Sequence, residues 1–168
     1  MKKPWLVLIL FVLLMPFSHA QDDKFKALFM YNFTKYLEWP ASKQSGEFII
    51  GVFGNSPIIS ELNIIAQKRK VGVQQIIVKK ITESSQLTDC SIIYVPDSRS
   101  TKIQEIMQSC NGKGVALITD KPGMAQTHSG INYVKINGKQ NFEINRKHLE
   151  AQGIKVNSAL LSLGIPVE

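Results

Sequence analysis

The chain has 168 residues and a net charge of +7, and 44% of its residues are hydrophobic. Its lysines and arginines are scattered, apart from two short clusters at Lys68-Arg69-Lys70 and Lys79-Lys80. Proteins that bind nucleic acids more often gather basic residues and aromatics on one face. We therefore expect a soluble basic surface and no nucleic-acid partner.

The N-terminus has the parts of a secretory signal peptide in their usual order. Lys2 and Lys3 precede an apolar stretch at 5–17, and Ser18-His19-Ala20 has small residues at both ends. The stretch is short of the ~20 apolar residues that span a bilayer. We predict a cleaved signal peptide at 1–20 and a periplasmic domain at 21–168, with a net charge of +5 after Lys2 and Lys3 are removed. An uncleaved N-terminal anchor is the alternative.

The first half of the mature chain alternates helices and apolar strands. Apolar residues at helical spacing predict a helix from Phe25 to Leu37, which Trp39-Pro40 would end. The apolar run at 48–53 predicts a strand buried on both faces. Gly54-Asn55-Ser56-Pro57 is typical of a turn and a helix start. That helix would run to about Lys68, and a strand would follow at 73–81.

The second half continues this alternation and then changes. Strands are predicted at 91–95 and 114–119, with a helix from 100 to about 110 between them. This order predicts an α/β fold, a single layered domain with a mostly parallel sheet flanked by helices. Asn137-Gly138 then joins two alternating segments, 131–136 and 140–145, as a C-terminal β-hairpin. Short helices are expected at 146–152 and 158–163.

The two cysteines would lie at the same edge of the sheet. Cys90 precedes a predicted strand and Cys110 ends the helix that follows it. Because a strand and its crossover helix run in opposite directions, these positions come close together. In an exported protein this favours a Cys90–Cys110 disulfide, with two separate buried thiols as the alternative. A structural bridge is favoured over a redox switch.

No catalytic or metal-binding motif is recognisable, so we expect neither an enzyme nor a cofactor. Polar residues do follow the parallel strands, at the carboxyl edge where α/β sheets bind ligands. These candidate ligand-edge residues are Asn55, Ser56, Asp97, Arg99 and Asp120. They would form a small polar pocket in a solute-binding protein, or they would simply cap helices.

Six of the chain's aromatic residues fall between Phe25 and Trp39. One helical face cannot hold them all, so the helix is either buried on two sides or carries an exposed aromatic patch for a partner. The phenylalanines suit the face toward the core, whereas Tyr and Trp tolerate a contact that is partly exposed to solvent. The predicted partner surface consists of Tyr31, Lys35, Tyr36 and Trp39. The competing interpretation buries Trp39 in the core.

Several segments have a distinctive sequence. They are Tyr31-Asn32-Phe33-Thr34-Lys35-Tyr36-Leu37-Glu38-Trp39-Pro40, the strand 48–54, the cysteine-led strand 90–95, the hairpin segments 130–134 and 142–145, and the C-terminal segment 154–161. Together these segments resemble the YfiR/HmsC-like family of periplasmic proteins. The resemblance covers nearly the whole mature chain, in order.

The resemblance implies a non-catalytic periplasmic regulator. Such a protein binds the exported domain of an inner-membrane signalling protein, typically a diguanylate cyclase, and thereby affects cyclic-di-GMP and biofilm formation. Other membrane sensors and a homodimer are alternative partners. Well-known members have two cysteine pairs and redox-linked states, whereas this chain has one candidate pair.

Overall fold

The computed structural model describes residues 17–168. The predicted signal peptide lies outside the described residues apart from 17–20, which form the first turn of helix α2 (Phe17–Phe33). Within residues 17–168, no helix is both long and apolar enough to cross a membrane.

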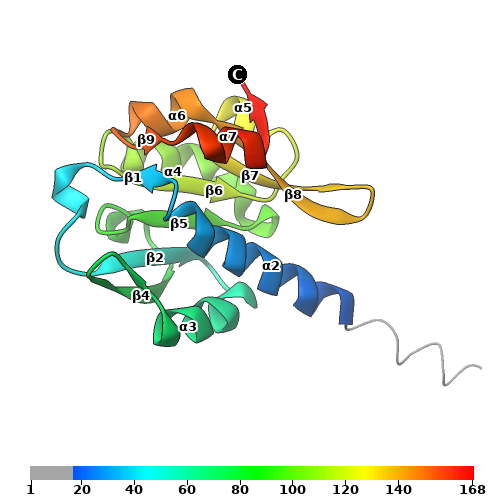
Figure 1. The fold of residues 1–168 in the computed structure, drawn as a ribbon, viewed down its shortest axis with the longest axis horizontal. Helices are drawn as coiled ribbons and strands as arrows, with labels where there is room; N and C mark the ends of the chain where they lie inside the picture. Colours follow the sequence, from blue (N-terminus) through cyan, green and yellow to red (C-terminus); the bar gives the residue numbers. More distant parts are fainter. Residues whose placement is uncertain (1–16) are drawn as a thin grey trace, which may run out of the picture.

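Helices and strands alternate along most of the chain after α2 (Figure 1). The first half contains β1 (Leu37–Glu38), β2 (Phe48–Phe53), α3 (Ile58–Lys68), β3 (Lys70–Val71), β4 (Gln74–Ile81) and β5 (Ile92–Val95). The second half contains α4 (Ile103–Cys110), β6 (Ala116–Thr119), α5 (Met124–Thr127), β7 (Ile131–Ile136), β8 (Lys139–Asn145), α6 (Arg146–Ala151), β9 (Lys155–Val156), α7 (Ser158–Leu163) and β10 (Ile165–Val167). Short 3-10 turns occupy Ala41–Lys43 (η1), Ser84–Gln86 (η2) and Asp97–Lys102 (η3).

The main sheet is mixed and has eight strands in the order β10-β8-β7-β6-β5-β2-β4-β3. Neighbouring strands from β4 through β2, β5 and β6 to β7 pair in parallel, whereas β3–β4 and β7–β8 pair antiparallel. The predicted α/β class is confirmed at this level. Asn137 and Gly138 connect β7 to β8 with φ angles of 51° and 76°, as a tight primed turn requires. The hairpin is not the edge of the sheet, because β10 pairs in parallel with β8.

Each face of the sheet carries its own apolar cluster. On one face, side chains of α2, α3 and α7 pack with Phe48, Ile50 and Tyr94. On the other, side chains of α4 pack with Ile93 and Leu117. Because both faces are covered, all six residues of β2 and all four of β5 are buried. This burial explains why both strands are continuous apolar runs in the sequence.

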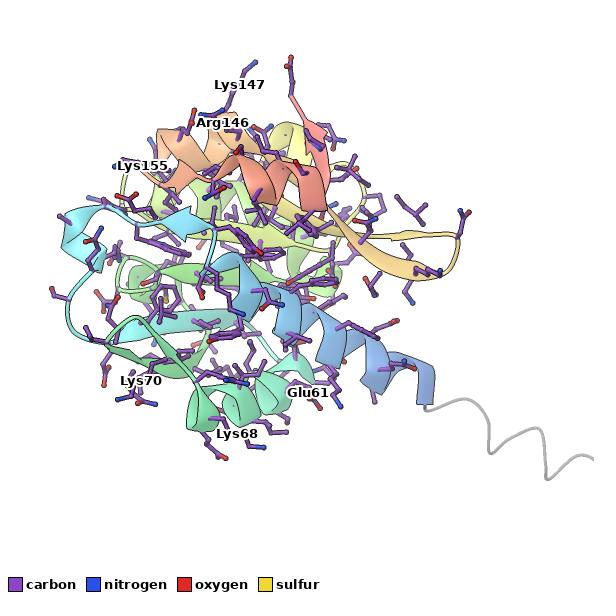
Figure 2. The ribbon with its side chains drawn as sticks, in the orientation of Figure 1. Glu61, Lys68, Lys70, Arg146, Lys147 and Lys155 are labelled. Atoms are coloured by element: carbon purple, nitrogen blue, oxygen red, sulfur yellow. The ribbon has the colours of Figure 1, made fainter. Side chains whose placement is uncertain are left out.

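Basic side chains lie at opposite ends of the molecule in Figure 2. Lys68 ends α3 and Lys70 begins β3, whereas Arg146 and Lys147 begin α6 and Lys155 begins β9. Arg146 is paired with Glu150 one helical turn away, at 2.6 Å. These labelled residues therefore form two separate groups.

Candidate functional site

The strands β2, β5 and β6 end at one edge of the sheet and bring the predicted ligand-edge residues there. Asn55 follows β2, Asp97 and Arg99 follow β5, and Asp120 follows β6. Ser56 is half-buried before α3, whose N-terminus has no side-chain cap. The edge divides into two regions: one is centred on Asp120, and the other contains Arg99.

Asp120 attaches helix α2 to the sheet. Its Oδ2 accepts hydrogen bonds from Lys26 Nζ and Tyr94 Oη, both at 2.5 Å, and its Oδ1 accepts one from the backbone N–H of Asp97 at 2.6 Å. Tyr133 completes the group, because its hydroxyl donates to the Lys26 carbonyl at 2.6 Å. We call this group the Asp120 anchor. All these contacts are internal, so the structure places Asp120 in the attachment of α2 rather than in an open pocket.

The anchor is largely removed from solvent. The Lys26 and Asp120 side chains are 14% and 15% exposed. Burial, and then the Asp120 charge, raises the pKa of Tyr94 well above its usual range. The pKa of Tyr133 is raised by the same two causes in the same order. Both hydroxyls therefore remain protonated donors at neutral pH.

Arg99 lies in the other region of this edge, against Gly54 and beside Asn55. These residues help to line a cavity of about 180 Å³ at the ends of β2 and β4. We call it the Arg99 cavity. Asn55, Asp97 and Arg99 are exposed, in contrast to Asp120.

Cys90 and Cys110 are buried free thiols in the structure. Both belong to the apolar cluster under α4, so the topology brings them to the same region, as expected. Burial raises the pKa of Cys90 to about 11 and that of Cys110 to about 12. In reduced form they would therefore be poor nucleophiles at neutral pH. The Cys90–Cys110 disulfide stays a prediction.

The predicted helix from Phe25 to Leu37 is corrected at both of its ends. Helix α2 begins at Phe17 and ends at Phe33, so Tyr36 and Trp39 lie beyond it. The chain leaves the helix because Leu37 pairs with Val156 of β9, and Tyr36 O accepts a hydrogen bond from Asn157 N at 2.9 Å. These contacts join residues far apart in sequence, and the local periodicity carries no sign of them.

Trp39 belongs to the core, so its expected exposure was wrong. It is 5% exposed. Its Nε1 donates to Ser91 O at 2.9 Å, and its ring meets Phe48 edge-to-face at 4.9 Å. A buried Trp needs both an apolar pocket and a partner for its N–H, and this site supplies both.

The other three residues of the predicted partner surface remain accessible to different degrees. Lys35 is exposed, and its ammonium lies 5.0 Å from the centre of the Tyr31 ring. Lys35 Nζ also donates to Asn32 Oδ1 at 2.8 Å. Tyr31 and Tyr36 are half-buried against the core cluster. Each tyrosine is thus partly accessible to solvent.

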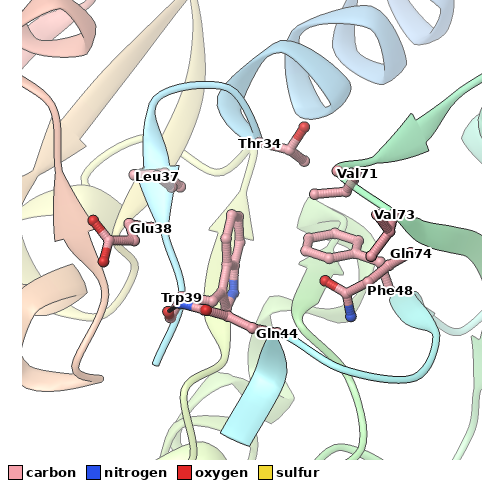
Figure 3. Close-up of a pocket in the computed structure, with 10 residues that line it drawn as sticks. Thr34, Leu37, Glu38, Trp39, Gln44, Phe48, Val71, Val73 and Gln74 are labelled. Carbon is pink, nitrogen blue, oxygen red and sulfur yellow. Dashed lines mark hydrogen bonds between the residues drawn. The ribbon is translucent and has the colours of Figure 1, made fainter. Parts of the chain in front are cut away.

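A groove of about 420 Å³ opens beside Trp39, between β1 and the β3–β4 turn (Figure 3). Its apolar lining is Leu37, Trp39, Phe48, Val71 and Val73, and Thr34 and Gln74 are among its polar residues. We call it the Trp39 groove. Its volume falls in the range of ligand pockets, about 300–1,000 Å³.

Of the residues that line this groove, only Trp39 was predicted from the sequence as a site residue, and the most exposed apolar residue that the prediction missed is Val73. It is 91% exposed, although the sequence placed it at the start of a strand. Gly72, with a φ of 57°, turns the chain between β3 and β4 and leaves Val73 at the tip. The Gly72-Val73 pair before the polar Gln74-Gln75 is the signal that could have indicated a turn.

The arrangement offers an apolar groove and a basic cavity. Among residues 17–168, no three His, Cys, Asp or Glu side chains are grouped so that they could hold a metal ion. The fold defines a small domain of the α/β class. The YfiR/HmsC-like family model matches residues 23–165, and the chain belongs to this family of periplasmic regulators. A search of curated proteins gave no significant match.

Proposed function

We propose that the protein is a periplasmic regulator without catalytic activity of its own. It binds the exported sensor domain of an inner-membrane signalling protein, typically a diguanylate cyclase. The observation that carries the proposal is the family match over residues 23–165. The signal-peptide pattern of residues 1–20 supports export to the compartment where such a sensor domain lies.

The Trp39 groove supports a binding role. Its floor of Trp39 and Phe48 is rigid, because the two rings pack against each other and Trp39 is hydrogen-bonded to the sheet. Val73 stands at its rim with almost its whole side chain in water. Covering such a side chain with a partner removes apolar area from water, which favours association by about 25 cal/mol per Å² before the costs of association.

Tyr31, Lys35 and Tyr36 extend this surface beyond the groove. Thr34 lines the groove and lies in the same turn as Lys35 and Tyr36. Tyrosines are enriched at interfaces because the ring is apolar and the hydroxyl can remain wet. The proposed partner surface therefore comprises the Trp39 groove with Tyr31, Lys35 and Tyr36, and Trp39 serves as its buried support.

Deletion of the gene tests this function in cells. Without the regulator, the membrane cyclase should be released, so cyclic-di-GMP and biofilm mass should rise. A plasmid copy of the wild-type gene should restore both. Unchanged cyclic-di-GMP in the deletion strain, measured by mass spectrometry of cell extracts, would contradict control of a diguanylate cyclase.

A further inference from the structure

The Arg99 cavity lies at the carboxyl ends of β2 and β4, and Arg99 reaches it from the segment after β5, next to the point between β2 and β5 where the direction of the chain through the sheet reverses. Strand β2 is flanked by β4 and β5. From β2 the chain passes through α3 to β4, whereas from β5 it passes through α4 to β6 on the other side. In open α/β sheets, the crevice at the carboxyl ends of two such strands is the usual place for a ligand.

The cavity is basic. Arg99 and Lys80 both line it, with Asn55 and Thr82 as further polar groups. Its remaining lining is Phe53, Gly54 and Ile81, so no carboxylate is among the described residues that surround it. Two cations without a counter-charge in one cavity would repel each other, and an anion would relieve that repulsion.

Three acidic residues, Glu83, Asp97 and Asp120, follow the strands at this edge, and their side chains have other partners. Asp120 is bound to Lys26 and Tyr94 in the anchor. The Glu83 side chain accepts a bond from the backbone of its own turn, η2. Asp97 is exposed, and its Oδ1 accepts a hydrogen bond from Ser100 Oγ at 3.4 Å. Within the described chain, neither Arg99 nor Lys80 forms an ion pair.

The Arg99 side chain lies against the backbone of Gly54. A Cβ atom at Gly54 would lie 2.8 Å from Arg99 Nε, and the φ angle of 82° also favours glycine there. Gly54 N donates to Ile81 O at 2.8 Å, which fixes the end of β2 beside the end of β4. A side chain at position 54 would therefore push Arg99 away from its present place against the backbone.

We propose that the Arg99 cavity binds a small phosphate-type oxyanion. Arg99 offers a planar fork of N–H donors, and Lys80 adds a second positive charge. The Asn55 amide and the Thr82 hydroxyl are available as neutral donors. At about 180 Å³, the cavity is smaller than pockets for drug-sized ligands, so it fits a single phosphate group rather than a whole nucleotide. This inference is independent of the proposed regulatory function.

The test is a titration of the purified mature protein with sodium phosphate, with sodium chloride at equal ionic strength as the reference. We expect saturable binding by calorimetry and a rise in melting temperature that chloride does not produce. Arg99→Met and Lys80→Met should each weaken phosphate binding at least tenfold. Lys79→Met is the matched control, because alternation along β4 directs Lys79 to the opposite face of the sheet.

A further variant tests the position of Arg99, and a further ligand tests the source of the phosphate group. Gly54→Ala should displace Arg99 and weaken binding while both cations remain. Vesicles of phosphatidylglycerol distinguish a lipid headgroup from a free phosphate: sedimentation of wild type but not of Arg99→Met would identify the headgroup as the source. Phosphate binding no stronger than chloride binding, or equal binding by Arg99→Met and wild type, would overturn the proposal.

Discussion

The Asp120 anchor and the Trp39 groove both join the segment after the predicted signal peptide to the sheet, but they leave very different surfaces. In the anchor, Lys26 and Asp120 neutralise each other away from water. In the groove, Trp39 is satisfied internally while Val73 next to it is exposed. The difference teaches that exposure, rather than region, should decide the effect of a substitution: buried residues such as Lys26 and Trp39 should matter for stability, whereas the exposed Val73 should matter for partner binding.

The largest loss of stability is expected from breaking the anchor. Lys26→Met leaves Asp120 buried without its counter-charge, and removing one partner of such a pair costs about 3–5 kcal/mol. Urea unfolding followed by circular dichroism measures the loss. The matched control is Lys155→Met, because Lys155 pairs with Glu38 at a site where both side chains are mostly exposed. A loss below about 1 kcal/mol in Lys26→Met would show that the pair is not a structural anchor.

Trp39→Ala should cost a similar amount. Removing a buried aromatic side chain leaves a cavity and typically costs about 3–5 kcal/mol. The backbone oxygen of Ser91 also loses its indole donor. The melting temperature of the purified variant measures the effect. An unchanged melting temperature would contradict the core position and restore Trp39 as a candidate contact residue.

The disulfide is expected to contribute about 3 kcal/mol if it forms, since it would close a loop of about 20 residues. Mass spectrometry of the protein isolated from the periplasm without reductant should show Cys90 linked to Cys110. Alkylation must follow unfolding, because both thiols are buried with raised pKa values and would react slowly even if free. Two alkylated cysteines after non-reducing denaturation would rule the bridge out.

The anchor should also make stability fall at high pH. The pKa of Tyr94 is raised in the native state, so this proton is held more tightly there than in the unfolded chain, where a tyrosine pKa is about 10. Stability from this group is therefore complete below pH 10 and decreases above it, by up to about 1.4 kcal/mol per pH unit. Tyr94→Phe should lessen the slope between pH 10 and 11. Equal slopes in the two proteins would exclude Tyr94 as the cause.

The sequence predicted the sheet better than it predicted the sites. β2, β5 and β6 were recognisable because strands buried on both faces are apolar runs, and β4 was recognisable by its Ile and Val residues. β10 was not recognised, since three residues that include Pro166 carry no strand pattern. The end of α2 was placed too late because Tyr36 and Leu37 continue the helical spacing, while the contact that ends it involves Val156.

For the sites, the sequence indicated which residues lie at which edge of the sheet. It did not indicate which side chains those residues contact. Polar residues after parallel strands were expected at one edge, and the structure does bring Asn55, Asp97, Arg99 and Asp120 there. The sequence could not show that Lys26, 94 positions away, neutralises Asp120 and leaves Arg99 without a counter-charge. A charged residue at this edge thus belongs to an anchor or stays open to solvent, according to whether a side chain of a distant element reaches it.

Val73→Asp is the measurement that tests the central proposal most directly. Val73 is 91% exposed, so the free energy of unfolding should change by less than about 0.5 kcal/mol. A charge at the rim of the Trp39 groove should nevertheless weaken binding to the purified periplasmic domain of the membrane cyclase at least tenfold. Leu163→Asp on α7, 58% exposed and outside the groove lining, should bind as wild type does. Equal affinity of Val73→Asp and wild type, measured by calorimetry, would contradict the proposed partner surface.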